Sequence, residues 1–132
     1  VLIPVTMCHE LSHLSGYMRE DEANFIAFLA CLQSDDPEFR YSGVYLASVH
    51  AMNALLTVDS DLWNQADALK SDALRRDIRS NNAYWKQYET PVSEVSDRVN
   101  DAYLKANGQE NGLRSYGRMV DLLLAYYRDE LQ

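Results

Sequence analysis

Residues 9–13 read His9-Glu10-Leu11-Ser12-His13, in which two histidines stand four residues apart with a glutamate beside the first. On an α-helix, residues four apart lie on one face, so both imidazoles can approach the same metal ion. The glutamate then lies next to the metal, where it can take a proton from a metal-activated water. The stretch therefore predicts a helix that carries two zinc ligands, His9 and His13, and a general base, Glu10.

The residues on either side of this stretch favour a helix. Apolar side chains recur around the two histidines, and no glycine or proline interrupts residues 5–15. Pro4 suits the opening of a helix, and Gly16 suits the position just after its end. We therefore expect a first helix that begins near Pro4 and ends before Gly16.

A zinc site needs a third protein ligand, and three carboxylates follow shortly after the second histidine. We prefer Glu20, because on a second helix Glu20, Ala23 and Asn24 share one face. Ala23 is small enough to let this helix approach the first. Glu22 is the second choice, and Asp21 is the third. In the alternative interpretation, these acids are a solvated first turn, where carboxylates favour the positive end of the helix dipole.

Groups behind the ligands can orient them. Asn24 is expected to hydrogen-bond His13 or Glu20 and so to fix the ring or the carboxylate. Glu22, if it is not itself a ligand, belongs to the same supporting layer.

The two motifs together resemble the gluzincin arrangement, in which an HExxH helix is completed by a glutamate in an ExxAD or ExxAN pattern on the next helix. Residues 20–24 read Glu-Asp-Glu-Ala-Asn, so the resemblance implies that Glu20 is the metal ligand. The chain departs from many gluzincins in having Asn24 where they have aspartate. It also has a short separation between His9 and Glu20.

Further stretches resemble an uncharacterised bacterial family that is described only as a domain of unknown function. They lie at residues 13–17, 39–43, 115–117 and 121–124. This resemblance covers nearly the whole chain, and it implies membrane-spanning helices ahead of the HExxH motif. The full-length protein is therefore expected to be membrane-associated and this segment to be soluble. The family brings no established substrate.

Composition limits the classes of protein and of partner. A chain of 132 residues with 47% hydrophobic content is expected to form one helical domain with a real core. A net charge of −8 and a pI of about 4.7 argue against nucleic acid or an anionic membrane surface as the main partner. No apolar run approaches the length of a membrane span. The expected partner is a peptide or protein substrate.

The start of the chain bears on its organisation. Only eight residues precede His9, whereas zincins commonly carry an upstream sheet whose edge strand holds the peptide. We therefore expect residues 1–132 to be the HExxH-containing C-terminal part of a longer protein.

Helical periodicity continues along the rest of the chain, and no alternating run indicates a strand. The fold class is therefore all-α, with a multi-helix zincin-like core in which the HExxH helix packs on the helix that carries Glu20. A turn is expected at residues 57–61 and a loop at residues 107–112. The later helices are expected at residues 24–33, 37–56, 61–88 with an interruption near 80–82, 94–106 and 113–131.

Each remaining candidate residue is interpreted either as part of the packed interior or as a functional group. A peptidase needs a donor for the carbonyl oxygen in the transition state, and Tyr41 and Tyr116 are the candidates, although interior packing is favoured for both. His50 lies among apolar residues and is expected to be a core histidine. Cys8 and Cys31 are expected to be small buried apolar residues.

A second function class competes with the peptidase. In it, the chain is a non-catalytic helical scaffold or interaction module with a structural or vestigial metal site. A structural site is closed by a fourth protein ligand, for which Asp21 or Glu22 is available.

Overall fold

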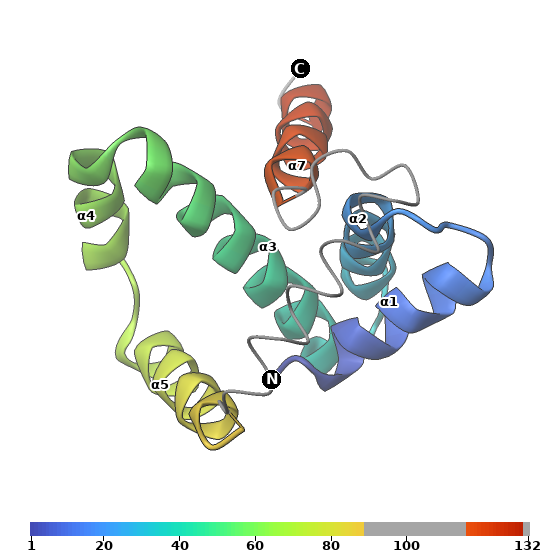
Figure 1. Ribbon diagram of the computed structural model, residues 1–132, viewed down its shortest axis with the longest axis horizontal. Coiled ribbons are helices and arrows are strands. Elements are labelled where there is room, and N and C mark those ends of the chain that lie inside the picture. Colours follow the sequence, from blue (N-terminus) through green and yellow to red (C-terminus); the bar gives the residue numbers. More distant parts are fainter. Residues whose placement is uncertain (89–115, 131–132) are drawn as a thin grey trace. The chain divides into compact units, whose positions relative to one another are not determined.

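The computed structural model describes residues 1–88 and 116–130. Within these ranges it contains helices and no strand, which confirms the all-α fold class (Figure 1). The helices are α1 (Ile3–Leu14), α2 (Glu20–Leu32), α3 (Pro37–Val58), α4 (Ser60–Ala68), α5 (Asp72–Lys86) and α7 (Tyr116–Glu130). They fall into two compact units: α1, α2, α3 and α7 form the first, and the second contains α4 and α5.

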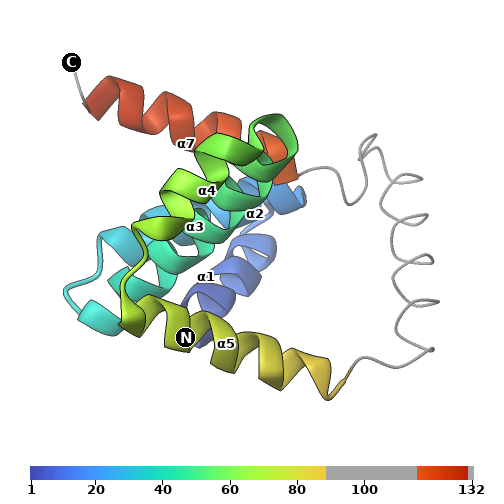
Figure 2. The same cartoon turned by 90° about the vertical axis from the view of Figure 1, so that its left-hand side faces the viewer.

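Helices α2 and α3 each pack against the other three helices of the first unit (Figures 1 and 2). One core cluster joins Phe28 of α2 to Ala47 of α3 and to two residues of α7, Met119 and Leu123. A second cluster joins Val5 of α1 to Ala27 and Cys31 of α2. In these two clusters, buried apolar side chains of one helix thus face a neighbouring helix, as an amphipathic bundle requires.

The two ends of α1 and the start of α3 follow from local chemistry. Pro4 lies in the first turn of α1, and Gly16 follows its end with a φ of 99°, a conformation that favours glycine. Asp36 caps α3, since its Oδ1 accepts a hydrogen bond of 2.8 Å from the backbone N–H of Glu38. The predicted turn at residues 57–61 is shorter than expected, because α3 continues to Val58 and α4 begins at Ser60.

The predicted interruption near residues 80–82 is wrong, since α5 runs through them and the break lies at residues 69–71. Two local interactions place the break there. The Ser71 hydroxyl caps α5 by accepting a bond from Leu74 N–H, and the Asp67 carboxylate binds both Lys70 and Arg75. Side chains at 80 and 82 are exposed, so their polarity costs α5 nothing. The predicted elements at 94–106 and 107–112 lie outside the described residues.

Gly43 permits a close approach of α3 to α2. A Cβ atom at this position would lie 2.6 Å from Cys31 Cβ and 3.3 Å from the backbone oxygen of Phe28, which is too close for either to tolerate without movement. Gly43→Ala should therefore lower the free energy of unfolding by about 1–3 kcal/mol, despite the better helix propensity of alanine. Chemical denaturation measures this, with Asn53→Ala on the exposed face of α3 as the control. Equal stability of Gly43→Ala and the parent would contradict the close packing.

His50 is a core histidine, as expected, and its side chain makes stability depend on pH. It is buried on α3, and burial lowers the pKa of the imidazole from 6.5 to about 4. At neutral pH the ring is uncharged in both states. Below about pH 6.5 the unfolded chain gains a proton that the folded chain takes up only near pH 4, so the folded state loses stability across this window.

His50→Gln should remove this loss. Urea unfolding of the metal-free protein at pH 7 and pH 4.5 is expected to show a smaller difference in the variant than in the parent. Equal pH dependence in the two proteins would show that His50 does not titrate in this way.

Candidate metal centre

Residues 9–13, with both histidines, lie on α1 as predicted. The turn after α1 brings the chain back toward the two imidazole rings. The backbone N–H of Gly16 donates to His13 O at 3.0 Å, and that of Tyr17 donates to Ser12 O at 3.1 Å, so α1 ends in a compact turn. Glu20 is the first residue of α2. Ala23, which is fully buried, lets α2 lie against α1 and keeps Glu20 beside the histidines.

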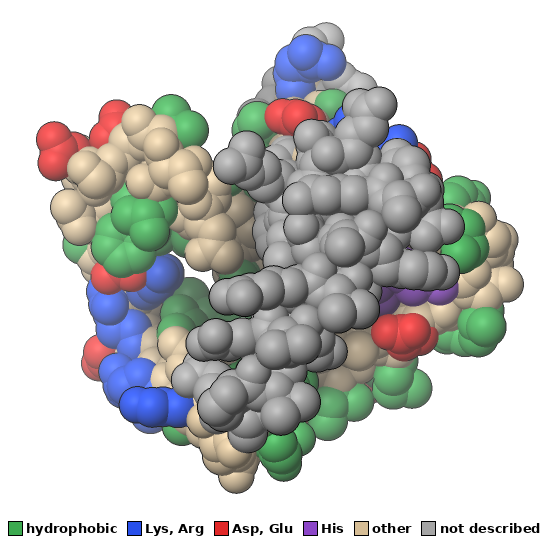
Figure 3. Space-filling model, in the orientation of Figure 1, with side chains coloured by type: hydrophobic (Ala, Val, Ile, Leu, Met, Phe, Trp, Pro, Cys, Tyr) green, Lys and Arg blue, Asp and Glu red, His purple; other side chains and the backbone are tan. Residues whose placement is uncertain are grey.

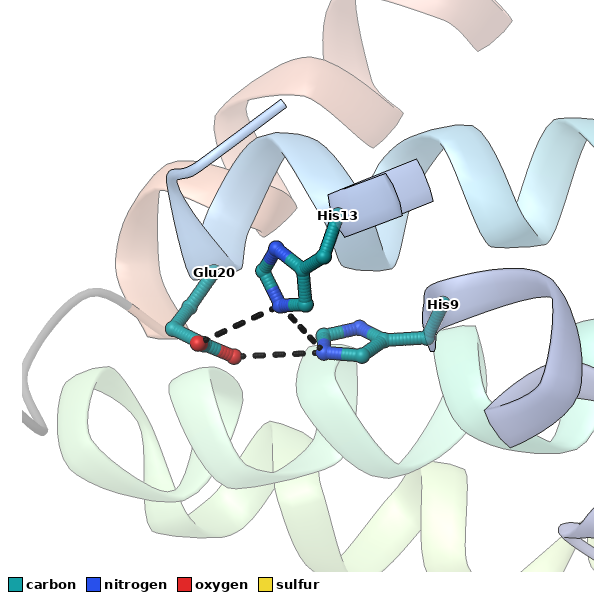
Figure 4. A group of neighbouring side chains, drawn as sticks. All are labelled: His9, His13 and Glu20. Atoms are coloured by element: carbon teal, nitrogen blue, oxygen red, sulfur yellow. Dashed lines mark hydrogen bonds and ion pairs between the residues drawn. The ribbon is translucent and has the colours of Figure 1, made fainter. Parts of the chain in front are cut away.

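Three donor atoms converge at this point (Figure 4). The Nε2 atoms of His9 and His13 are 3.0 Å apart. One carboxylate oxygen of Glu20 lies 3.3 Å from His9 Nε2, and the other lies 3.4 Å from His13 Nε2. The two rings meet edge to face with their centroids 4.6 Å apart. One donor atom from each of the three side chains thus lies within 4.8 Å of the other two, and the group can hold a metal ion.

The separations between the donors fit a small divalent cation. Ligand atoms at the roughly 2.0–2.1 Å distance of a tetrahedral zinc site lie about 3.3 Å from one another. The two Nε2 atoms are 3.0 Å apart, and each lies 3.3 or 3.4 Å from a different oxygen of the Glu20 carboxylate, so each separation is close to this value. Two unprotonated imidazole nitrogens at 3.0 Å repel each other unless a proton or a cation lies between them. Nitrogen and carboxylate donors suit zinc and several other divalent transition metals.

A backbone carbonyl orients one of the rings. His13 Nδ1 lies 2.7 Å from Tyr17 O, and this carbonyl can only accept, so Nδ1 carries the proton and Nε2 presents its lone pair to the other donors. His9 Nδ1 is buried, and it has no hydrogen-bond partner among the residues that the structure describes. His13 is therefore held in the tautomer that a metal ligand needs.

Arg19 engages the other two carboxylates of this segment, those of Asp21 and Glu22. Its guanidinium makes two hydrogen bonds of 3.3 Å to the nearly buried carboxylate of Asp21 and lies 3.5 Å from Glu22 Oε1. The hydrogen bond and the charge of Asp21 raise the pKa of Arg19. Both alternative ligands are thus held by a cation, whereas Glu20 faces the rings. Glu20 was the preferred third ligand for a different reason, its shared face with Ala23.

A pocket of about 250 Å³ adjoins the donors on the side of Glu10. Val5, which is buried, forms part of it, and the backbone N–H of Val5 donates to Ser42 Oγ, which ties α1 to α3 at 3.1 Å. Glu10 is exposed and makes no ion pair within the described part of the chain. The pocket is lined by residues of α1, α2 and α3: Val5, Thr6, His9, Glu10, Asn24 and Leu46.

Of the residues predicted to support the ligands or the oxyanion, Asn24 lines the pocket and Tyr41 does not. Asn24 lines the pocket beside His9 and Glu10, and in the described part of the chain it makes no hydrogen bond to His13 or Glu20. Tyr41 is half exposed on α3, with its ring 6.3 Å from that of Tyr45, and it does not line the pocket. Tyr116 begins α7, and its side chain lies outside the described residues.

Sequence reasoning missed two supports of the site, the Tyr17 carbonyl and the Arg19 side chain. Signals for both were present. A glycine just after a helix predicts a tight turn whose N–H groups donate to the last helical carbonyls, which keeps the residues of the turn, Tyr17 among them, close to the end of the helix. An arginine beside three acids predicts competition for those acids.

Comparison with known proteins places the chain in a family without assigning chemistry. The family model described as "Protein of unknown function (DUF3810)" matches residues 1–124. Searches of curated proteins and of solved structures find no match. Among the described helices, none has the length and apolar character needed to cross a membrane.

Proposed function

The chain belongs to the DUF3810 family, as the resemblance to a domain of unknown function implied, and we propose that it is a zinc-dependent metallopeptidase. The observation that supports this most strongly is the convergence of His9, His13 and Glu20 beside a pocket that contains Glu10. Two histidines and one glutamate leave a coordination position open, which is the donor set of several zinc hydrolases. The packing of the HExxH helix α1 on α2 supports the gluzincin resemblance.

In the proposed reaction, three residues bind the metal and a fourth transfers protons. His9, His13 and Glu20 hold the metal, and His13 keeps its orientation through the Tyr17 carbonyl. Zinc bound there would polarise the scissile carbonyl and lower the pKa of a water to about neutrality. Glu10 accepts the proton of the attacking water and passes it to the leaving amine. Its exposed carboxylate, which no ion pair engages in the described part of the chain, is suited to this exchange.

Other parts of the proposal rest on resemblance alone. The substrate is a peptide or protein, and the full-length protein is attached to a membrane. Tyr41 and Tyr116 stay candidates for the group that stabilises the oxyanion.

A second function has one observation in its favour. Apolar side chains at helical spacing lie on the outer face of α1, each more than half exposed, and Figure 3 shows hydrophobic side chains gathered along this edge of the molecule. They are Ile3, Met7, Leu11 and Leu14. Such a face suits a non-catalytic interaction module with a structural metal. The acids that would close a structural site, Asp21 and Glu22, are held by Arg19, which favours an open, catalytic site.

A cleavage assay tests the proposal. Metal-free protein and protein reloaded with one equivalent of zinc are incubated with a mixture of unstructured peptides, and products are identified by mass spectrometry. We expect new cleavage products that depend on zinc and disappear with a chelator. A protein that holds one zinc per chain and cleaves nothing would instead support the interaction module.

A further inference from the structure

Two thiols from different helices meet in the core cluster that joins α1 to α2. Cys8 lies on α1 and Cys31 on α2, and their sulfur atoms are 3.9 Å apart. Both are free thiols. The sequence predicts each of them only as a small buried apolar residue, because nothing in the spacing of two positions 23 apart indicates that they meet. Their contact depends on the antiparallel return of α2 along α1.

The two thiols differ in their access to solvent. Cys31 is fully buried in the cluster with Val5 and Ala27, and Cys8 packs on the edge of this cluster with part of its surface exposed. Burial, followed by the neighbouring Cys8 thiol, raises the pKa of Cys31 to about 12. A small molecule in solution can therefore reach Cys8. Cys31 is enclosed, and the thiol that lies beside it is that of Cys8.

The surroundings keep the buried thiol beside its partner. Gly43 of α3 lies against Cys31, since a Cβ atom built on the glycine would be 2.6 Å from Cys31 Cβ and 3.7 Å from its sulfur. Disulfide sulfurs are about 2.05 Å apart, so the two sulfurs must approach each other by about 2 Å. Rotation about the Cα–Cβ bond of each cysteine moves its sulfur between staggered positions, and this is the motion that would bring the two sulfurs together.

The segment between these cysteines contains the three candidate metal ligands and the candidate base. His9, Glu10, His13 and Glu20 all lie between residues 8 and 31. We propose that Cys8 and Cys31 are a redox-sensitive pair that closes into a disulfide on exposure to a small aliphatic disulfide. The disulfide then links α1 to α2, the two helices that carry the metal donors. A cross-link between α1 and α2 restricts the unfolded chain more than the folded one, so the oxidised protein is the more stable form.

The reaction is a thiol–disulfide exchange in two steps. The Cys8 sulfur attacks one sulfur of the oxidant and forms a mixed disulfide, and one molecule of the small thiol leaves with the Cys8 proton. The Cys31 sulfur then attacks the Cys8 sulfur, and the second small thiol leaves with the Cys31 proton. The two protein thiols are oxidised by two electrons in total, and the oxidant is reduced to two thiols.

The experiment uses the metal-free protein and 2-hydroxyethyl disulfide, with intact-mass analysis and peptide mapping. We expect the protein to lose the mass of two hydrogen atoms and to yield one cross-linked peptide that joins Cys8 to Cys31. The unfolding temperature should rise by roughly 10 °C, as a loop of this length predicts, and a reductant should reverse the rise. A persistent adduct of the small thiol on Cys8, or no reaction in the folded protein, would overturn the proposal.

A variant that keeps Cys8 as its only cysteine identifies which thiol reacts first with the small disulfide. Cys31→Ala, which keeps the buried site apolar, should accumulate the mixed disulfide at Cys8 and show no reversible rise in unfolding temperature. Circular dichroism verifies that this variant is folded. If Cys31→Ala showed the same rise as the parent, the stabilisation would not come from the cross-link. The parent protein by itself still tests the proposal through its peptide map if the variant does not fold.

Discussion

Replacing Glu20 or His13 by alanine should abolish stoichiometric zinc binding, because each variant removes one of the three donors that converge within 4.8 Å. Changes to groups behind a metal ligand already weaken affinity by about 10–100-fold, so loss of a ligand itself should weaken it by more than about 100-fold. Elemental analysis after dialysis against a weak chelator measures the zinc content. We expect close to one zinc per chain in the parent and almost none in either variant.

Glu22→Ala is the matched control for Glu20→Ala. Glu22 lies in the same first turn of α2, but its carboxylate is engaged by Arg19 rather than by the histidines. This variant should therefore keep the zinc content of the parent. Zinc retained in His13→Ala would refute the site, and zinc lost in Glu22→Ala but kept in Glu20→Ala would assign the third ligand to Glu22.

Replacing Glu10 by glutamine should leave zinc binding intact and reduce peptide cleavage by about 10²–10⁴-fold. The amide keeps the shape of the side chain at the edge of the pocket but cannot accept the proton of the attacking water. Zinc content and kcat/KM are measured on the same preparation. Glu38→Gln, an exposed glutamate in the first turn of α3, removes the same charge away from the site and should change neither quantity.

The two readouts together separate the roles of Glu10. Undiminished cleavage by Glu10→Gln would remove this residue from the mechanism. A fall in zinc content to the same extent as activity would make Glu10 a ligand or a support for the metal rather than a proton acceptor.

Local periodicity explains the parts of the fold that could be predicted from the sequence. The two ends of α1 depend on Pro4 and Gly16 and the start of α3 on Asp36, and the effects of these residues on the backbone reach only a few residues. The break between α4 and α5 was misplaced because Asn and Ser at residues 80–82 resemble a turn. On an exposed helix face these residues are tolerated, and the Ser71 cap and the Asp67 ion pairs place the break elsewhere.

The shared face of His9 and His13 follows from the sequence, because the four-residue spacing and the helix period are both local. Which carboxylate lies beside them depends on how the next helix packs. Glu20 lies beside the two rings, and the contacts of Arg19 with Asp21 and Glu22 depend on the path of the turn after Gly16. The contact between Cys8 and Cys31 likewise required α2 to return along α1. Helix periodicity acts within a few residues, whereas these contacts depend on the packing of whole helices.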